Sequence, residues 1–250
     1  MTINPHIPDS VEARAIESVE RALEQITKGG IVILVDDEDR ENEGDMVMAA
    51  QDATPQNITV MANEARGLIC TPMIGDDLDR LGLPMQVQNN TAEHGTAFTV
   101  TVDSKFGITT GISSADRAHT IQLLADLESS TANFVQPGHV FPLRYEEGGV
   151  LVRAGHTEGS VDLVRLAGKH PAAVICEILN DDGTMARRPQ LETIAEKHDF
   201  PIVTIADVIA YRMSHEKLVE RGAEARLPTA HGVFKAIAYK SFVDPSEHVA

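Results

Sequence analysis

The chain has 250 residues, which is enough for one large domain or two small ones. Its composition is that of a globular protein, with 42% hydrophobic and 24% charged residues, and its net charge at pH 7 is −17. Nucleic acids and anionic membranes bind basic surfaces, so this acidity argues against both as general partners. It does not exclude a local basic pocket for a small phosphate ester.

Cys70 and Cys176 are the two cysteines, and each lies in an apolar run. We therefore expect two buried, reduced thiols and a cytoplasmic protein. No Cys-x-x-Cys pair is present, which argues against a cysteine zinc site. The first residues lack a signal-peptide pattern, and no apolar run reaches the roughly 18 residues that a membrane-spanning helix needs.

The chain is predicted to begin with a helix and a strand. Ser10 has the side chain of an N-cap, and the Gly29-Gly30 pair would end the helix. Between them apolar residues recur at helical spacing: Ile16, Val19, Leu23 and Ile26. The apolar, β-branched run 31–35 that follows has the length of a buried strand.

Residues 36–45 form an acidic loop that holds seven carboxylates and one arginine, Arg40. The loop lies between the strand 31–35 and a second apolar run, 46–50, so two core strands are expected to hold it in place. Crowded carboxylates repel one another and raise one another's pKa values, and a hard cation such as Mg²⁺ removes that penalty. The alternative is a solvated acidic turn, and the residues alone leave both interpretations open.

The middle of the chain is predicted to alternate helices and strands. Thr54-Pro55 would open a helix with Ile58, Met61 and Ala65 on one face. Shorter elements are expected afterwards: a strand at 68–71, a helical turn at 76–81 and a strand at 97–102. The next helix would be capped by Ser113, with Asp116 three residues later. The glycines and hydroxyls of residues 107–113 are compatible with an anion site or with an ordinary cap.

Two histidines lie at predicted turns. His139 directly follows Pro137-Gly138, and a single histidine at a turn is usually structural or solvated. His156 lies in the corner Arg153-Ala154-Gly155-His156-Thr157, between a predicted strand at 150–152 and a helix with Val161, Val164 and Ala167 on one face. A guanidinium, backbone N–H groups and a capping threonine suit a phosphate dianion, but an ordinary capped turn has the same pattern.

The run 172–178 is predicted to be a buried strand, yet it contains Glu177. A buried carboxyl group needs a partner or a proton, and either state suits a general acid or base. The strand alternation also allows Glu177 to face water. A turn at 181–183, a helix at 189–198, a strand at 202–205 and a final helix from Asp207 to about Arg221 complete the pattern. We therefore expect a single α/β domain over residues 1–222, followed by a separate tail, 223–250.

Together, the acidic loop, the Gly138-His139-Val140-Phe141-Pro142-Leu143 segment and the corner 153–158 resemble the 3,4-dihydroxy-2-butanone 4-phosphate synthase family of riboflavin biosynthesis. The resemblance extends from about Ser10 to Arg221 and keeps the order of the family's motifs. One departure is Gln136, where the family usually has arginine before Pro-Gly-His. This difference bears on a local charge contact only.

The resemblance implies a three-layer α-β-α fold with a mixed sheet, and a homodimer. It implies conversion of D-ribulose 5-phosphate to L-3,4-dihydroxy-2-butanone 4-phosphate and formate with Mg²⁺ or Mn²⁺. Glu41 and His156 would be metal ligands, and Glu43 would support the metal through water. His139 and Glu177 would be essential for proton transfer. The substrate-binding residues would be Arg40, Glu41, Asp45, Arg153, Ala154, Gly155, His156, Thr157 and Glu177.

The tail from Leu227 to Tyr239 resembles the opening of GTP cyclohydrolase II, a domain that bifunctional proteins carry after the synthase. The chain stops before that domain's zinc cysteines, so we expect the second activity to be absent. Two rival functions remain open at the level of the sequence. One is a protein that binds a phosphorylated metabolite or a divalent metal without catalysis, which would not need His139 and Glu177. The other is a metal-dependent isomerase or aldolase acting on a sugar phosphate.

Overall fold

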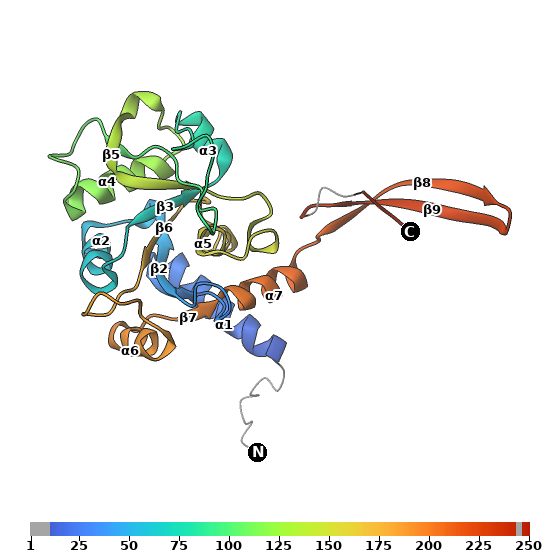
Figure 1. Cartoon of the computed structure of the whole chain (residues 1–250), viewed down its shortest axis with the longest axis horizontal. Coiled ribbons are helices and arrows are strands. Elements are labelled where there is room, and N and C mark those ends of the chain that lie inside the picture. Colours follow the sequence, from blue (N-terminus) through green and yellow to red (C-terminus); the bar gives the residue numbers. More distant parts are fainter. Residues whose placement is uncertain (1–10, 244–246) are drawn as a thin grey trace, which may run out of the picture.

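A computed structural model of the chain describes residues 11–243 and 247–250 (Figure 1). The described residues form a seven-stranded mixed sheet of order β4-β5-β3-β6-β2-β1-β7. The β1/β7 and β3/β5 pairs are parallel, and the other neighbours are antiparallel. The strands are β1 (Val32–Val35), β2 (Gly44–Ala49), β3 (Cys70–Met73), β4 (Val102–Ser104), β5 (Phe134–Arg144), β6 (Ala173–Glu177) and β7 (Ile202–Thr204).

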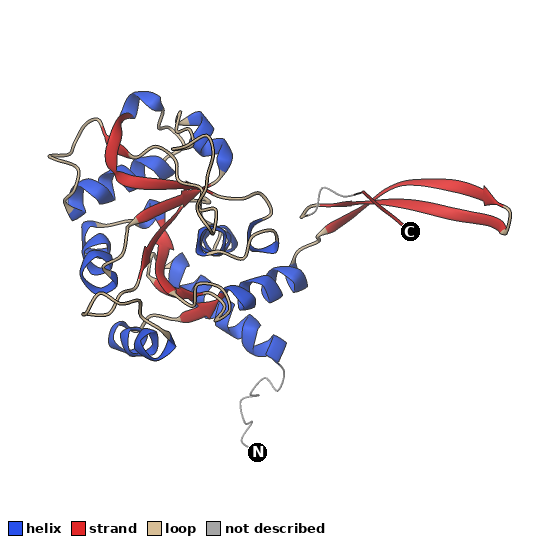
Figure 2. Ribbon diagram, viewed as in Figure 1, coloured by secondary structure: helices blue, strands red, loops and turns tan. Residues whose placement is uncertain are grey.

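Helices cover both faces of this sheet, as Figure 2 shows. The helices are α1 (Val11–Thr27), α2 (Pro55–Val60), α3 (Gly75–Arg80), α4 (Ser114–Ala125), α5 (His156–Leu166), α6 (Arg188–His198) and α7 (Ile205–His215). Successive strand residues point to opposite faces, so Ile33 packs with α2, α4 and α6 while Leu34 packs with α1, α5 and α7. The predicted three-layer α-β-α architecture with a mixed sheet is confirmed.

Most elements lie where the sequence predicts them. Val19 and Ile26 of α1 are fully buried, although the proposed cap Ser10 lies outside the described residues. The Thr54 hydroxyl accepts a hydrogen bond from the Asn57 N–H, which confirms the cap of α2. This helix continues into a π-helical turn at Met61–Ala65. The Ser113 hydroxyl caps α4 in the same way, accepting from the Asp116 N–H.

Three predicted elements are wrong. The strand expected at 97–102 is displaced to β4, which pairs with β5 across a bulge between Val102 and Asp103. Residues 149–151 form a 3₁₀ turn instead of a strand, because Gly148 and Gly149 have positive φ and the Val150 N–H donates to Asp162. The final helix ends at His215, not near 221, because the chain from Val219 onward pairs as a strand.

The C-terminal residues form a β-hairpin of β8 (Val219–Thr229) and β9 (Gly232–Ser241), to which β10 (Glu247–Val249) adds a short third strand. In Figure 1 this hairpin extends away from the helices and the main sheet. Its outer residues, including Leu227 and Phe234, are exposed. No helix among the described residues is long and apolar enough to cross a membrane.

Candidate active site

The candidate site is a cavity of about 90 Å³ on the face of the sheet that α5 covers. Asp45 at the start of β2 lies directly opposite Glu177 at the end of β6, so both carboxyl groups project on the same side. The N-terminus of α5 brings His156 and Thr157 to them. The cavity is lined by Arg40, Glu41, Glu43, Asp45, Cys70, Thr96, Phe98, Leu143, Arg153, His156, Thr157, Ile175 and Glu177.

The acidic loop is folded around the buried carboxylate of Asp36. This carboxylate accepts hydrogen bonds from the N–H of Glu43 at 2.8 Å and of Glu41 at 3.1 Å, and it pairs with Arg40 at 2.8 Å. Arg40 also pairs with Glu41 at 2.8 Å. The loop thus has two parts. Residues 37–39 are exposed, whereas Glu41, Glu43 and Asp45 line the cavity. The solvated-turn interpretation holds only for the exposed part.

His156 lies at the centre of this cluster. Its Nδ1 lies 3.7 Å from Glu41 Oε2, and its Nε2 lies 3.9 Å from Asp45 Oδ1. Both His156 Nε2 and Asp45 Oδ1 are buried and have no hydrogen-bond partner among the described residues. Asp36, Glu41 and His156 each offer one ligand atom, and these three atoms lie within 4.8 Å of one another. Buried polar atoms are almost always paired, so this arrangement fits a bound cation or ligand.

The charges of the cluster shift one another's pKa values. The interaction with His156 and the charge of Arg40 outweigh burial and lower the pKa of Glu41 to about 2. Burial raises the pKa of Asp45, and burial also raises that of Glu43. For His156, burial lowers the pKa, but the neighbouring carboxylates of Asp45 and Glu41 outweigh it and raise the value. Such perturbed groups converging on a cavity are typical of functional sites.

The corner 153–157 differs in detail from its prediction. The N-cap of α5 is Gly155, with no side-chain cap, and Thr157 lies buried within the first turn instead of capping it. Arg153 folds back over Gly155, where a Cβ atom would overlap the guanidinium, and pairs with buried Glu158 at 2.5 Å. Ala154 is exposed, and neither it nor Gly155 lines the cavity.

Arg153 also reaches the loop that precedes β4. It donates a hydrogen bond to the backbone carbonyl of His94 at 2.8 Å, and Thr96 of the same loop lines the cavity. The sequence interpretation missed Asp36 as a possible ligand, and it missed His94 and Thr96 as neighbours of the site. The position of Asp36 at the end of a buried strand was an available signal, whereas the approach of His94 and Thr96 depends on tertiary structure alone.

Glu177 and His139 occupy different surroundings. Glu177 is half-buried, lines the cavity, and accepts a hydrogen bond from the Leu68 N–H at 2.8 Å. His139 lies within β5, not after a turn, and is not among the residues that line the cavity. Its Nδ1 lies 2.7 Å from the buried carboxylate of Asp103, and its side chain is 45% exposed. One chain therefore does not bring the two predicted proton-transfer residues into one cavity.

The alternative anion site at residues 107–117 is filled by the protein itself. The Asp116 carboxylate accepts hydrogen bonds from the N–H groups of Thr109 and Gly111 and from the Thr109 hydroxyl. These hydrogen bonds lower the pKa of Asp116. The segment is therefore a capped helix start with an internal carboxylate. Gln136 donates to the Gly82 carbonyl and does not line the cavity.

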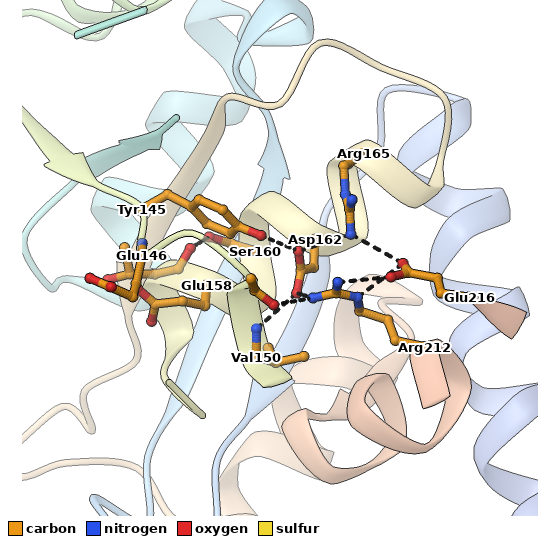
Figure 3. Close-up of polar contacts among 11 residues, drawn as sticks. Tyr145, Glu146, Val150, Glu158, Ser160, Asp162, Arg165, Arg212 and Glu216 are labelled. Carbon is orange, nitrogen blue, oxygen red and sulfur yellow. Dashed lines mark hydrogen bonds and ion pairs between the residues drawn. The ribbon is translucent and has the colours of Figure 1, made fainter. Parts of the chain in front are cut away.

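A second group of buried charges lies along α5 (Figure 3). Its central residues, Asp162 and Arg212, do not line the cavity. Asp162 accepts hydrogen bonds from the Tyr145 hydroxyl at 2.9 Å, the Val150 N–H at 2.9 Å and Arg212 at 2.6 Å. Arg212 of α7 also donates to the Gly148 carbonyl at 2.8 Å. This network holds the turn 145–151 that leads to the corner. All of its buried charges are paired.

The chain is similar to known proteins over most of its length. Residues 20–211 match the family model of 3,4-dihydroxy-2-butanone 4-phosphate synthase. The chain belongs to this family. The resemblance inferred from the motifs is confirmed, and it connects the chain with riboflavin biosynthesis. Riboflavin biosynthesis protein RibBA of Nocardia farcinica is 54% identical over 236 residues, which cover 94% of this chain and 57% of that protein. The chain thus spans little more than half the length of such relatives.

Solved structures of similar proteins share the fold. A two-domain 3,4-dihydroxy-2-butanone 4-phosphate synthase from A. baumannii, RibBX, is 48% identical with a TM-score of 0.86, covering 93% of this chain and 68% of that one. A 3,4-dihydroxy-2-butanone 4-phosphate synthase in complex with two magnesium ions is 38% identical with a TM-score of 0.77, covering 79% of this chain and 97% of that one. The acidic cluster described above is thus present in a chain whose structural neighbour holds Mg²⁺.

Proposed function

We propose that the chain converts D-ribulose 5-phosphate to L-3,4-dihydroxy-2-butanone 4-phosphate and formate. The observation that carries the proposal is a pair of buried atoms, Asp45 Oδ1 and His156 Nε2, that have no hydrogen bond among the described residues. They lie in a cavity that Glu41 and Glu177 also line. A site with this donor set suits a divalent cation together with an oxygen-rich substrate. The overall reaction splits the five-carbon substrate into a four-carbon phosphate and formate, and it needs no external oxidant.

The donor set fits Mg²⁺ or Mn²⁺, with Glu41 and His156 as ligands and Asp36 within reach of both. When bound, the metal supplies Lewis-acid polarisation of the substrate carbonyl and stabilises the developing enediolate. Arg40 neutralises part of the carboxylate charge, and it holds Glu41 toward His156. Glu43 lines the same cavity and would support the metal through water.

The corner holds the phosphate end of the substrate. The N-terminus of α5 offers backbone N–H groups that have no intrahelical acceptor, and Thr157 of the same turn lines the cavity. Asp45 is placed to hydrogen-bond a substrate hydroxyl, because its carboxyl group is buried and its pKa is raised. Arg153 contributes a positive charge at the rim while it holds the corner through Glu158. Ala154 and Gly155 act through their backbone only.

Glu177 accepts the proton in the cavity, and dehydration and the carbon shift require a second group that exchanges protons. His139, oriented by Asp103, has the chemistry for this role, but it lies outside its own chain's cavity. We therefore propose a homodimer in which the second copy supplies His139. Two exposed apolar side chains support a contact surface there. Val135 belongs to the same strand as His139, and Ile112 follows Gly111, which lies against the His139 ring.

We further propose that residues 1–222 carry this reaction, and that 223–250 form the start of a GTP cyclohydrolase II-like unit. The two free, buried cysteines support a cytoplasmic location.

The test is formate release from D-ribulose 5-phosphate, measured with Mg²⁺ and again after EDTA. We expect formate with Mg²⁺ and none with EDTA. Substrate binding without formate would contradict the proposal and favour a binding protein, and a rearranged sugar phosphate without formate would favour an isomerase or aldolase. Mixing the inactive His139→Ala and Glu177→Gln chains tests the shared site. Restored turnover is expected, and none after verified subunit exchange would contradict it.

A further inference from the structure

Residues 66–68, which lie just before β3, hold the carboxylate of Glu177. The Leu68 N–H donates to Glu177 Oε2 at 2.8 Å. Among the described residues no hydrogen bond engages the other oxygen, Oε1. A single backbone donor thus fixes one oxygen of the carboxylate and leaves the second one available for chemistry.

Arg66 ties this segment to the chain that follows Glu177. Its guanidinium donates to the Leu179 carbonyl at 2.9 Å and pairs with Asp181 at 2.7 Å. The Leu179 N–H in turn donates to the Ala65 carbonyl at 2.8 Å. Arg66 has a φ of 70°, a left-handed conformation that non-glycine residues rarely adopt. Such strain persists only where the surrounding contacts enforce it, and it is common at functional sites.

Gly67 allows the close approach of the two segments. A Cβ atom at this position would overlap the backbone carbonyl of Glu177 and its side-chain Oε2. The backbone of residue 67 therefore lies directly against the glutamate that it positions. Any larger residue here has to displace either Glu177 or the segment itself.

We propose that Arg66, Gly67 and Leu68 form a clamp that positions Glu177 as the proton acceptor of the reaction. This inference rests on the proposed function. In the step that the clamp serves, a substrate C–H bond breaks, its electron pair stays on the substrate to form the enediolate, and the proton moves to Glu177 Oε1. Because the Leu68 N–H holds Oε2, the carboxylate meets the substrate in one orientation. Arg66, Gly67 and Leu68 are positioning residues.

The first test is Gly67→Ala, with Gly75→Ala as its matched control. At Gly75 an added Cβ would meet only the end of the flexible Arg144 side chain, away from the cavity. We expect Gly67→Ala to lower kcat about 10- to 100-fold, because misplacement of a reacting group by about 1 Å has effects of that size. KM and Mn²⁺ affinity should stay close to wild type, since the clamp contacts neither the corner nor His156. Gly75→Ala should leave kcat unchanged.

Non-additivity between substitutions at Glu177 and Gly67 distinguishes a positioning role from a general structural defect. In a Glu177→Asp background the carboxylate is already displaced, so adding Gly67→Ala should lower kcat much less than it does in the wild type. An equal further loss would indicate a structural role and would overturn the clamp.

Arg66→Gly provides the second variant if Gly67→Ala does not fold. Glycine accepts the left-handed conformation without strain, so the fold should be retained while both ties to residues 179–181 are lost. We expect a lower kcat with an unchanged KM. Wild-type kcat in Arg66→Gly, or in a folded Gly67→Ala, would overturn the clamp. If Glu177→Gln itself keeps its turnover, the proposed role of Glu177 is wrong; if only Glu177→Gln is inactive, the clamp alone fails.

Discussion

Helix α5 carries two groups of buried charges that differ in one respect. Around Asp162 and Arg212 every buried charge has a partner. At the N-terminus of the same helix, His156 Nε2 and Asp45 Oδ1 are equally buried but lie 3.9 Å apart and have no hydrogen bond among the described residues. Desolvating a polar group without a partner costs free energy that folding alone does not return. The comparison therefore separates charges that hold the fold from charges that we propose bind a metal and a substrate.

The largest effect is expected at Glu177. Glu177→Gln keeps the side chain's size but removes the proton acceptor, so turnover should fall about 10²- to 10⁴-fold. Binding of D-ribulose 5-phosphate and the free energy of unfolding should change little, because the substitution removes no partner of a buried charge. Steady-state formate assays and calorimetric binding measure both. Near wild-type turnover would show that Glu177 has no part in proton transfer.

A substitution in the Asp162–Arg212 group should instead lower the free energy of unfolding. Asp162→Ala leaves Arg212 with Glu216 as its one remaining carboxylate partner among the described residues. It also leaves the Tyr145 hydroxyl and the Val150 N–H without their acceptor, so the free energy of unfolding should fall by about 3–5 kcal/mol. Urea unfolding followed by circular dichroism measures this change. Glu192→Ala, which removes an exposed pair with Arg188, is the control and should cost about 1 kcal/mol or less. A loss at Asp162 as small as that of the control would remove the distinction between the two groups.

A smaller, pH-dependent effect is expected at Glu41. Its pKa in the folded chain is about 2, below the ordinary value of 4.5, so its ionised form stabilises the fold above pH 4.5. This contribution is lost as the pH falls from 4.5 toward 2. Without metal, Glu41→Gln should thus be less stable than wild type at pH 7, and the gap should narrow below pH 5. Urea unfolding in EDTA across this range is the measurement, and a gap independent of pH would contradict the assignment.

The sequence predicted the layered fold because apolar periodicity reports directly on burial. Ile33 and Leu34 alternate between the two faces, and Thr54 and Ser113 cap helices as their side chains suggest. It failed at residues 150–152, where a three-residue apolar run carries too little pattern to distinguish a strand from a 3₁₀ turn. It also failed at the end of α7, since strand pairing with residues far along the chain overrode the helical spacing.

The site could be predicted in part. The acidic loop and the corner 153–157 each contain a dense local pattern, and tertiary structure brings Glu41, Asp45 and His156 together as expected. The contacts that orient them are long-range: Glu177 depends on Leu68, and Arg153 depends on His94. No local sequence pattern predicts such long-range pairs. His139 likewise reads as an isolated histidine in the sequence, and its partner Asp103 becomes visible only across the β4–β5 pairing.

The most direct test of the central claim is Mn²⁺ binding, counted by electron paramagnetic resonance. Chains with Glu177→Gln, saturated with D-ribulose 5-phosphate, would be compared with and without His156→Ala. If Asp45 Oδ1 and His156 Nε2 belong to the metal site, Mn²⁺ binds the chain that keeps His156. The Mn²⁺ affinity then falls at least ~10-fold in the chain that carries His156→Ala. Equal affinity in both chains would contradict the account, because His156 would then not be a metal ligand.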